Sequence, residues 1–284
     1  MKHILSFHPC IEADVNIICA GRSPTPFEED LIKKAKAIIL PQGCGARLYW
    51  LCRLNCPHVF PNFDYRFFAE GKIGDAILFQ RLKLPHPKTK VYRCLEKFLA
   101  IHTLECLNLP FPYPFVLKGN YGGEGSMVFL IKDKEELMKH LEMLKGMEER
   151  GASKGFVLQE YIEKGNRDLR VVVIGEKLFL YWRYQPNPHN FLTNVGAGAI
   201  IDHDVSQEVR KKAQFWVKKL CSATGINLAA IDLLFPKGGR DLKPLFLEIN
   251  PRVTTSMVAL EMASDMNIAE ETWSLPAFLM NTIL

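Results

Sequence analysis

The sequence has no long hydrophobic run. None of its apolar stretches approaches the roughly 18 consecutive residues that a membrane-spanning helix requires. The opening residues, MKHILSFHP, contain only a short apolar block before His8 and Pro9, too short for the core of a signal peptide. We therefore expect a soluble, cytoplasmic protein that has no membrane partner.

The sequence also has little excess of charge of one sign. Lysine and arginine total 36 and aspartate and glutamate total 31, so the formal net charge is +5. So small and evenly spread a surplus argues against a nucleic-acid or anionic membrane partner, whereas it suits an enzyme that holds phosphates. With 48% apolar and 24% charged residues, the composition excludes a disordered or collagen-like chain. A length of 284 residues predicts roughly two domains.

The eight cysteines lack the paired C-x2-C spacing that is typical of structural zinc sites. In a long chain without a secretion signal we expect them to be reduced thiols. One group, Cys44, Cys52, Cys56 and His58, has two interpretations. It could hold a metal ion, but the helical spacing of Cys52 and Cys56 favours buried small hydrophobic side chains.

The order of expected elements divides the chain at residue 88. Strands, one of them expected at 15–19, alternate with helices over residues 1–88, which predicts a parallel sheet and an N-terminal α/β domain. Within it, Thr25, Pro26 and Glu28 form the pattern of a helix start. The proline-containing segment 84–92 is expected to be an extended connector. The remainder, 89–284, is predicted to be α+β, with a helix at about 93–107 and expected strands at 115–118, 127–131, 156–162, 169–175, 177–184, 228–235 and 245–250.

A glycine-rich loop follows the expected strand 115–118, and Lys118 closes that strand. Glycines such as Gly123 and Gly125 let backbone N–H groups approach a phosphate, and Ser126 adds a hydroxyl donor. A second strand follows the loop, whereas a helix follows the loop of P-loop and dinucleotide-binding motifs. We therefore expect a hairpin flap over a ligand, with a ligand-free glycine turn as the alternative. Lys118 favours the flap, because a buried ammonium without an anion is costly.

Three polar side chains interrupt two apolar strands near the end of this region. They are Asp232 in LAAIDLLF and Glu248 and Asn250 in LFLEIN. An antiparallel hairpin centred on residue 240 places Asp232 opposite Glu248, with Cβ atoms roughly 5 Å apart. Oxygen ligands of this kind favour Mg²⁺ or Mn²⁺ over zinc. The alternative is a solvent-facing strand surface, but the apolar neighbours favour a metal site.

The lysine strand, the glycine flap and the carboxylate–amide set, in this order, resemble the ATP-grasp ligases, especially the RimK-type and glutathione synthetase-like members. The resemblance runs from about Lys72 to Arg252. It implies an ATP-grasp fold in which a small lobe (about 89–155) and a large lobe (about 156–284) clasp ATP.

The resemblance also implies a role for individual residues. Lys72, in GKIGDAILFQRLKLPHPKT (71–89), and Lys118 would contact the phosphates of the nucleotide. In VLQEYI, backbone atoms of Glu160, Tyr161 and Ile162 would bind adenine. The remaining matches are Asp168 for ribose, Arg170, Arg183 and Asn194 for phosphate or substrate, and Asp232, Glu248 and Asn250 for the metal. Three of these matches have an alternative. Lys72 could be a solvated residue on a helix, Asp168 a turn residue, and Arg170 a strand residue that faces water.

The chain departs from the RimK pattern after Asn250. It continues Pro251-Arg252, which looks more like the ending in biotin carboxylase, carbamoyl-phosphate synthetase and the amino-acid ligases of pyrrolysine and methanofuran assembly. In that resemblance Arg252 would direct a fork of donors at the γ-phosphate or an acyl phosphate. Bicarbonate is therefore a possible acid substrate.

These patterns together predict an ADP-forming carboxylate–amine ligase that uses ATP with Mg²⁺ or Mn²⁺. Lys118, Arg170 and Arg252 are the expected catalytic residues, and an acyl phosphate is the expected intermediate. The expected partners are a small carboxylate and an amine, and a homodimer is the default assembly. A bicarbonate-using carboxylase and an ATP-binding protein without turnover are the alternative functions.

Overall fold

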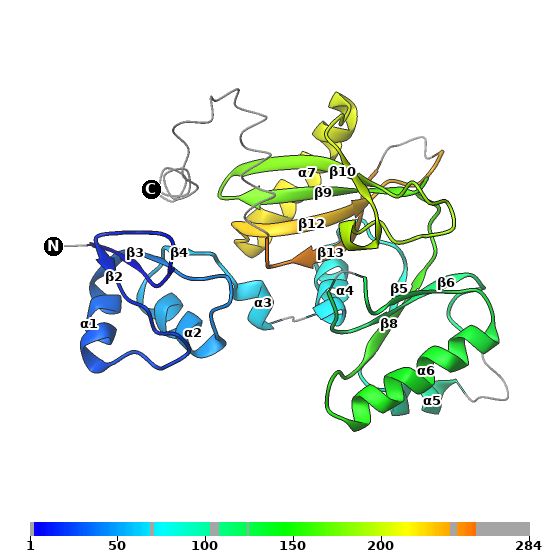
Figure 1. Ribbon diagram of the computed structural model, residues 1–284, viewed down its shortest axis with the longest axis horizontal. Coiled ribbons are helices and arrows are strands. Elements are labelled where there is room, and N and C mark those ends of the chain that lie inside the picture. The colour runs from blue at the N-terminus through cyan, green and yellow to red at the C-terminus, as the bar shows by residue number, and fades with distance from the viewer. Residues whose placement is uncertain (1–2, 69–70, 103–107, 124, 239–242, 254–284) are drawn as a thin grey trace.

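The computed structural model describes residues 3–68, 71–102, 108–123, 125–238 and 243–253. In this part of the chain the strands form three sheets, one parallel and two antiparallel. Figure 1 shows the parallel sheet and its helices on one side of the molecule and the two antiparallel sheets on the other.

The N-terminal region is built on a four-stranded parallel sheet, as its alternating pattern predicts. The strand order is β2-β1-β3-β4. The helix start at Thr25 is confirmed, because its Oγ1 accepts from Glu28 N while the Glu28 carboxylate accepts from Thr25 N. The elements of this region are β1 (His3–Ser6), β2 (Val15–Asn16), α1 (Pro26–Lys34), β3 (Ala35–Ile39), α2 (Ala46–Asn55), β4 (Val59–Phe60) and α3 (Asp64–Phe68).

The cysteines of this region pack in its apolar core. Cys44, Cys52 and Cys56 are buried beside Leu5 and Ile38, and burial raises the pKa of all three thiols. They therefore behave as small hydrophobic side chains. Among the described residues, no group of three or more His, Cys, Asp or Glu side chains is placed to hold a metal ion.

A four-stranded antiparallel sheet forms the next layer, with the order β5-β8-β6-β7. Two helices cover one of its faces, and the shared core includes Phe98, Phe156 and Leu141. The opposite face is turned toward the other antiparallel sheet (Figure 1). These elements are β5 (Thr89–Tyr92), α5 (Leu95–Ile101), β6 (Phe115–Gly119), β7 (Val128–Ile131), α6 (Lys134–Glu149) and β8 (Phe156–Glu160).

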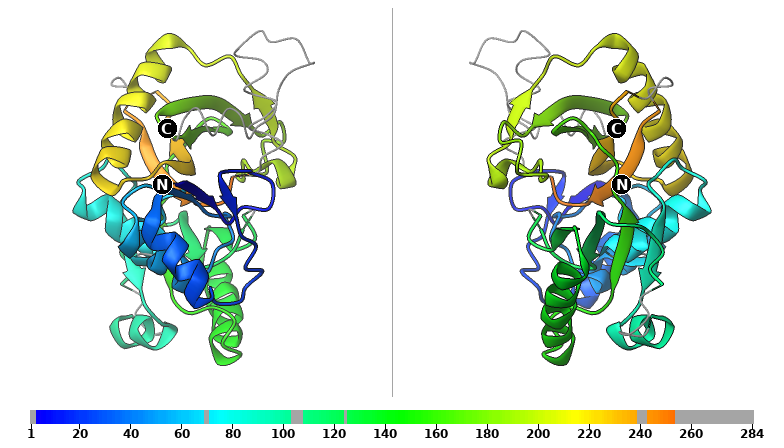
Figure 2. Two further views of the ribbon diagram at one scale, coloured as in Figure 1. Left: turned by 90° about the vertical axis from the view of Figure 1, so that its left-hand side faces the viewer. Right: turned by 90° about the vertical axis from the view of Figure 1, so that its right-hand side faces the viewer.

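The five-stranded antiparallel sheet has the order β11-β10-β9-β12-β13. Its elements are β9 (Arg167–Ile174), β10 (Lys177–Tyr184), η1 (Val195–Ala197), β11 (Ile200–Asp202), α7 (Gln207–Thr224), β12 (Leu228–Leu234) and β13 (Leu245–Asn250). Figure 2 shows α7 and α6 at opposite ends of the molecule. Among the described helices, none is both long and apolar enough to span a bilayer.

The two faces of this sheet pack against different partners. Val171 and Val173 of β9 face the core under α7, whereas Val172 packs against the N-terminal region through residues such as Ile39 and Phe60. Because side chains alternate along a strand, the face that carries Val172 continues into Arg170 and Asp168. The sheet therefore presents charged groups on the side away from α7.

A β-bulge sets which side chains of β13 face that side. Asp232 pairs with Glu248, as the hairpin prediction requires, but Leu233 pairs with Phe246. Leu247 is thus an extra residue in β13, and the alternation changes there. Phe246 consequently points into the core under α7, while Glu248 faces Asp232 across the strands.

Helix α4 (Gly71–Arg81) packs against β5, β8 and β13, and Figure 1 shows it between the two antiparallel sheets. The stretch 71–89 named in the resemblance thus begins with a helix, and this helix contacts the later sheets although the division at residue 88 assigns it to the first region. The division at residue 88 itself stays a prediction.

Three local predictions differ from the structure. The segment expected to be a connector contains β5, because residues 89–92 pair with β8, a partner distant in sequence. The strand expected at 15–19 is only Val15–Asn16. The helix expected at about 93–107 is described as Leu95–Ile101, since His102 already has an extended backbone and bonds Tyr92 Oη through its ring at 2.8 Å; residues 103–107 lie outside the described chain.

We expect Phe246→Ala to lower the free energy of unfolding by about 3–5 kcal/mol, because a fully buried ring is removed from a packed core. The ring lies 5.3 Å from that of Phe79 on α4, so the change also loosens α4 from β13. Urea denaturation measures the effect. The control is Phe215→Ala on the exposed side of α7, for which we expect less than about 0.5 kcal/mol; equal midpoints for the two variants would contradict this account of the core.

Candidate active site

A cleft lined by residues of both antiparallel sheets lies between them, and proteins bind small molecules in concave sites of this kind. One wall comes from β6 and β8, and the opposite wall from β9, β10, β12 and β13. Most of the predicted site residues line it: Lys72, Lys118, Gly125, Glu160, Tyr161, Ile162, Asp168, Arg170, Arg183, Asn194, Asp232, Glu248 and Asn250. The chain therefore brings together side chains that lie up to 178 positions apart in the sequence.

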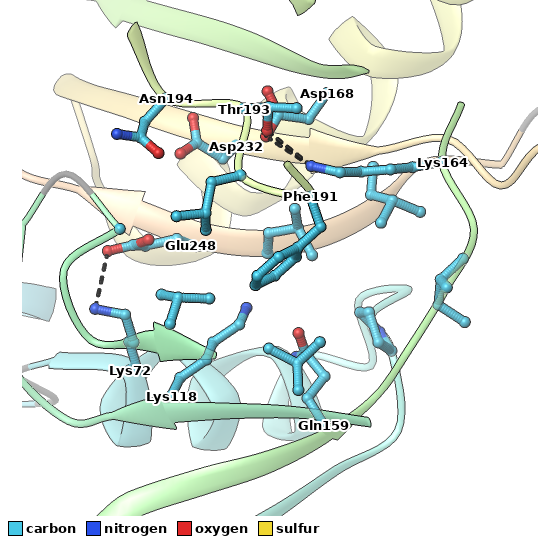
Figure 3. Close-up of a pocket in the computed structure, with 18 of the residues that line it drawn as sticks. Lys72, Lys118, Gln159, Lys164, Asp168, Phe191, Thr193, Asn194, Asp232 and Glu248 are labelled. Atoms are coloured by element: carbon cyan, nitrogen blue, oxygen red, sulfur yellow. Dashed lines mark hydrogen bonds and ion pairs between the residues drawn. The ribbon is translucent and has the colours of Figure 1, made fainter. Parts of the chain in front are cut away.

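Lys118 lies at the end of β6 and is only 8% exposed. Figure 3 shows its ammonium directed into the cleft, and no described residue forms a hydrogen bond with Nζ. Burial lowers the pKa of Lys118 to about 8, although Glu248 opposes the shift. A buried cation without a hydrogen-bond acceptor is costly, so this position is suited to an anionic ligand.

Lys72, near the start of α4, is held close to the glycine loop. Its Nζ donates to the carbonyl of Gly122 at 3.0 Å and lies 3.5 Å from Glu248 Oε1. Asn120, the first residue after β6, caps the same helix: its carbonyl accepts from Lys72 N and its side chain from Ile73 N. Lys72 therefore connects the loop between β6 and β7 with β13.

The glycine loop joins two antiparallel strands and is a hairpin, as predicted. Its tip crosses the cleft, because a Cβ added at Gly125 would lie 2.9 Å from Asn194 Oδ1 on the opposite side. Gly125 also has a φ of +75°, which strains other residues. Within the described part of the loop, Gly122 and Gly125 line the cleft, whereas Gly123 and Ser126 are exposed and do not.

Asp232 binds the two arginines of its sheet. Its carboxylate accepts from Arg170 Nε at 2.8 Å and Nη2 at 3.0 Å, and Arg183 Nη2 lies 3.0 Å from Oδ2. Burial alone would raise the pKa of Asp232, but Arg183 and Arg170 outweigh it and hold the pKa at about 2. The Asn250 amide nitrogen lies 3.2 Å from Asp232 Oδ2. Asp232, Glu248 and Asn250 therefore do converge, as predicted.

Asp168 is fully engaged with protein groups. Arg183 donates to both of its oxygens at 2.8 and 2.9 Å, and the hydroxyl of Thr193 donates to Oδ2. Lys164 Nζ is 3.7 Å from the same oxygen and donates to Thr193 Oγ1 (Figure 3). In this structure Asp168 positions Arg183; its expected contact with ribose stays a prediction.

Tyr161 and Ile162, which follow β8, line one part of the cleft. Glu160 N donates to Lys88 O, and the Glu160 side chain accepts from Lys88 N, which leaves the chain at Tyr161 and Ile162 beside the cleft. Apolar side chains contribute to the lining of the cleft as a whole, namely Pro87, Val116, Val128, Phe191, Leu192, Leu234 and Leu247. The cleft thus combines apolar side chains, which suit a flat base, with the charged side chains of the five-stranded sheet.

A model of the RimK-like ATP-grasp domain matches residues 69–274. The chain belongs to the RimK-like ATP-grasp family. A Xylella fastidiosa protein named "Probable alpha-L-glutamate ligase" is 28% identical over 203 residues, which cover 69% of this chain and 63% of that protein. "Glutamate--LysW ligase ArgX" of Sulfurisphaera tokodaii is 26% identical over 77% of this chain and 75% of its own length. The first of these relatives is thus matched over less than two thirds of its length.

Solved structures show the same ATP-grasp fold. The RimK domain ATP-grasp protein of Sphaerobacter thermophilus has a TM-score of 0.60 at 15% identity, covering 91% of this chain and 95% of that one. D-alanine–D-alanine ligase of Bacillus anthracis also has a TM-score of 0.60, at 13% identity, over 95% and 84% of the two chains. The predicted family and the predicted fold of the ATP-grasp region are confirmed.

Sequence reasoning missed several residues of the ATP-grasp cleft. Gln159, Lys164, Phe191 and Thr193 line it. Gln159 interrupts an apolar strand, as Asp232 does, and that signal could have identified it. Lys164, Phe191 and Thr193 lie in irregular segments, where side-chain direction has no period. Arg252, by contrast, is exposed and is not among the lining residues, so its catalytic role stays a prediction.

The affinity of the ATP-grasp cleft for ATP should fall as pH rises through about 8, because Lys118 then loses the charge that faces the ligand. Above that pH we expect the affinity for ATP to fall by up to tenfold per pH unit, because ATP binding then requires Lys118 to take up one proton. Calorimetric titration at several pH values measures it. Lys118→Arg is the control, since a guanidinium stays charged over this range; a parallel decline in both proteins would contradict the role of Lys118.

Lys118→Met should make the protein more stable at pH 7. The pKa of Lys118 is lower in the folded protein than in the unfolded chain. The unfolded chain therefore binds more protons between the two values, and stability rises with pH in that window. Removing the ammonium eliminates this cost, which amounts to at most about 3 kcal/mol. Thermal melting should show a higher Tm together with loss of ATP binding. A lower Tm would mean that contacts of Lys118 within the fold more than offset the cost of burying its charge.

Proposed function

We propose that this protein is an ATP-dependent, ADP-forming ligase that joins a carboxylate to an amine through an acyl phosphate. Membership of the ATP-grasp family supports the use of ATP, and the relatives named as glutamate ligases support the reaction class. The observation that carries the proposal is the position of Lys118, a buried ammonium directed into the cleft opposite Glu248, Asn250 and Asp232.

The same geometry supports a division of the nucleotide between the two ends of the cleft. The base would lie on the apolar lining beside Tyr161 and Ile162, and the phosphates would lie beneath the glycine hairpin. There Lys118 and Lys72 supply positive charge from one wall and Arg170 and Arg183 supply it from the other. Fixed charges of this kind stabilise phosphoryl transfer by neutralisation and positioning.

The donor set fits a hard divalent cation. Glu248 is partly exposed, and among the described residues its carboxylate has one ion pair, the 3.5 Å contact with Lys72. Asn250 also lines the cleft, and its amide nitrogen lies 3.2 Å from Asp232 Oδ2, so the set offers carboxylate and amide oxygens in one part of the cleft. Mg²⁺ and Mn²⁺ prefer such oxygen ligands. We therefore propose that Asp232, Glu248 and Asn250 hold the ion, which would neutralise phosphate charge when bound.

In the proposed reaction a carboxylate oxygen of the substrate attacks the γ-phosphorus of ATP. The bond between that phosphorus and the β,γ-bridging oxygen breaks, and ADP leaves. The amine nitrogen then attacks the acyl carbon, loses a proton, and displaces phosphate. Lys118 and the arginines would hold the phosphoryl group during both steps, while the Gly125 hairpin and the Phe191–Asn194 segment limit the access of water.

Glutamate is the first substrate to test, both as the acid and as the amine, because two relatives are named for it. Small amines and amino acids are the corresponding acceptors in the proposal. The experiment is a screen for ADP formation that depends on ATP, Mg²⁺, the acid and the amine together. The homodimer expected from the sequence stays a prediction.

We expect Lys118→Ala and Glu248→Gln each to reduce ADP formation by about 10²–10³-fold, as is typical when one charge-stabilising group is removed from an active site. Glu176→Gln, in the exposed turn after β9, is the matched control and should retain full activity. Near-normal rates in either cleft variant would mean that the reaction centre lies elsewhere.

Hydroxylamine trapping separates the ligase from its alternatives. An organic acyl phosphate yields a hydroxamate whose mass identifies the acid, so we expect a stable hydroxamate in the presence of the true substrate. ATP consumption that depends on bicarbonate without such a product would indicate a carboxylase. Tight ATP binding without turnover in any substrate mixture would indicate a binding protein.

A further inference from the structure

Asp75 is a buried carboxylate that the proposed reaction does not use. It lies on α4, three residues after Lys72, and residues at this spacing share one face of a helix. Its side chain is almost fully buried, with 6% of the residue exposed, and it is absent from the lining of the cleft. Burial, followed by the charge of Glu248, raises its pKa well above the usual range. A group that is this costly to bury requires an explanation.

The carboxylate contacts the strand that carries two of the proposed metal ligands. Asp75 Oδ2 accepts a hydrogen bond from Ile249 N at 3.1 Å, and Ile249 lies between Glu248 and Asn250. Among the described strands, β13 lies at the edge of its sheet, so one row of its backbone groups has no described neighbouring strand to pair with. The Asp75 carboxylate accepts a hydrogen bond from that row of backbone groups, and this contact fixes the position of α4 along β13.

The charged groups that act on Asp75 are residues of the proposed site. Lys72 and Lys118 face it with positive charge and Glu248 with negative charge, and Tyr65 of α3 adds a neighbouring hydroxyl. The same helix brings Lys72 within 3.5 Å of Glu248 Oε1. Helix α4 therefore reaches β13 by two contacts one turn apart, an ion pair between side chains and a hydrogen bond to the backbone.

We propose that Asp75 is a positioning residue: its hydrogen bond to Ile249 holds Glu248 and Asn250 at a fixed distance from Lys72, and so sets the geometry in which a metal–triphosphate complex is bound. This inference rests on the proposed function. The Lys72–Glu248 contact exchanges partners when a phosphate or a cation enters, whereas the bond from Asp75 reaches a backbone group that neither ligand can occupy. It therefore preserves the spacing of the two elements throughout the reaction.

The test uses the full chain and three substitutions of Asp75. Asp75→Asn keeps an oxygen acceptor at the same distance but removes the charge, Asp75→Glu keeps the charge but displaces the acceptor, and Asp75→Ala removes both. Calorimetry measures ATP affinity with and without Mn²⁺, and thermal melting identifies any variant that fails to fold. Displacements of about 1 Å at such sites cost up to about 10²-fold.

We expect Asp75→Asn to remain within threefold of the parent in Mn²⁺-dependent ATP affinity. Asp75→Ala and Asp75→Glu should lose about tenfold or more, while their metal-free ATP affinity changes less, because the loss lies in the spacing of Glu248 and Asn250. If Asp75→Ala fails to fold, the comparison of Asp75→Asn with Asp75→Glu decides.

Three results would overturn the proposal: parent-like affinity in Asp75→Ala, equal losses in the Asn and Glu variants, or equal losses with and without Mn²⁺. A parent protein that binds no ATP would instead refute the proposed function, so the two failures are distinguishable.

Discussion

The cleft depends on the burial of Asp232 between two arginines. Arg170 on β9 and Arg183 on β10 both reach this carboxylate on β12, so one anion connects three strands and lets two cations lie at the floor of the site. A buried pair of this kind adds little stability by itself, but removing one partner leaves an uncompensated charge. Asp232 therefore keeps Arg170 and Arg183 oriented toward the cleft, and Asp168 holds Arg183 as a second anionic partner.

Lys118 shows the opposite arrangement on the facing wall. Asp232 neutralises its cationic neighbours, whereas Lys118 remains without a hydrogen-bond acceptor among the described residues and its pKa is lowered by burial. On the wall under the glycine hairpin, the burial of the Lys118 charge destabilises the fold. On the opposite wall, the charges of the arginines are neutralised by Asp232. Such asymmetry is typical of binding sites, where affinity for a ligand is gained at the expense of stability.

The sequence predicted the fold and much of the site because the relevant patterns are local. Apolar strands interrupted by Asp232 and Glu248, and the hairpin that pairs them, follow from alternation and loop length alone. The hydrogen bonds of Asp168, the accessible position of Arg252 and the contact from Asp75 to Ile249 do not follow from such patterns. They depend on which elements pack together in the folded chain, and neither residue spacing nor residue type predicts that packing.

The bulge at Leu247 has a consequence for how this chain can change during evolution. A single residue deleted or inserted between Leu247 and Asn250 would reverse which side chains of this part of β13 face the core and which face the cleft. It would therefore place a polar side chain, Glu248 or Asn250, in the apolar core. The number of residues from Leu247 to Asn250 is therefore constrained by the bulge and by the pairing of Asp232 with Glu248.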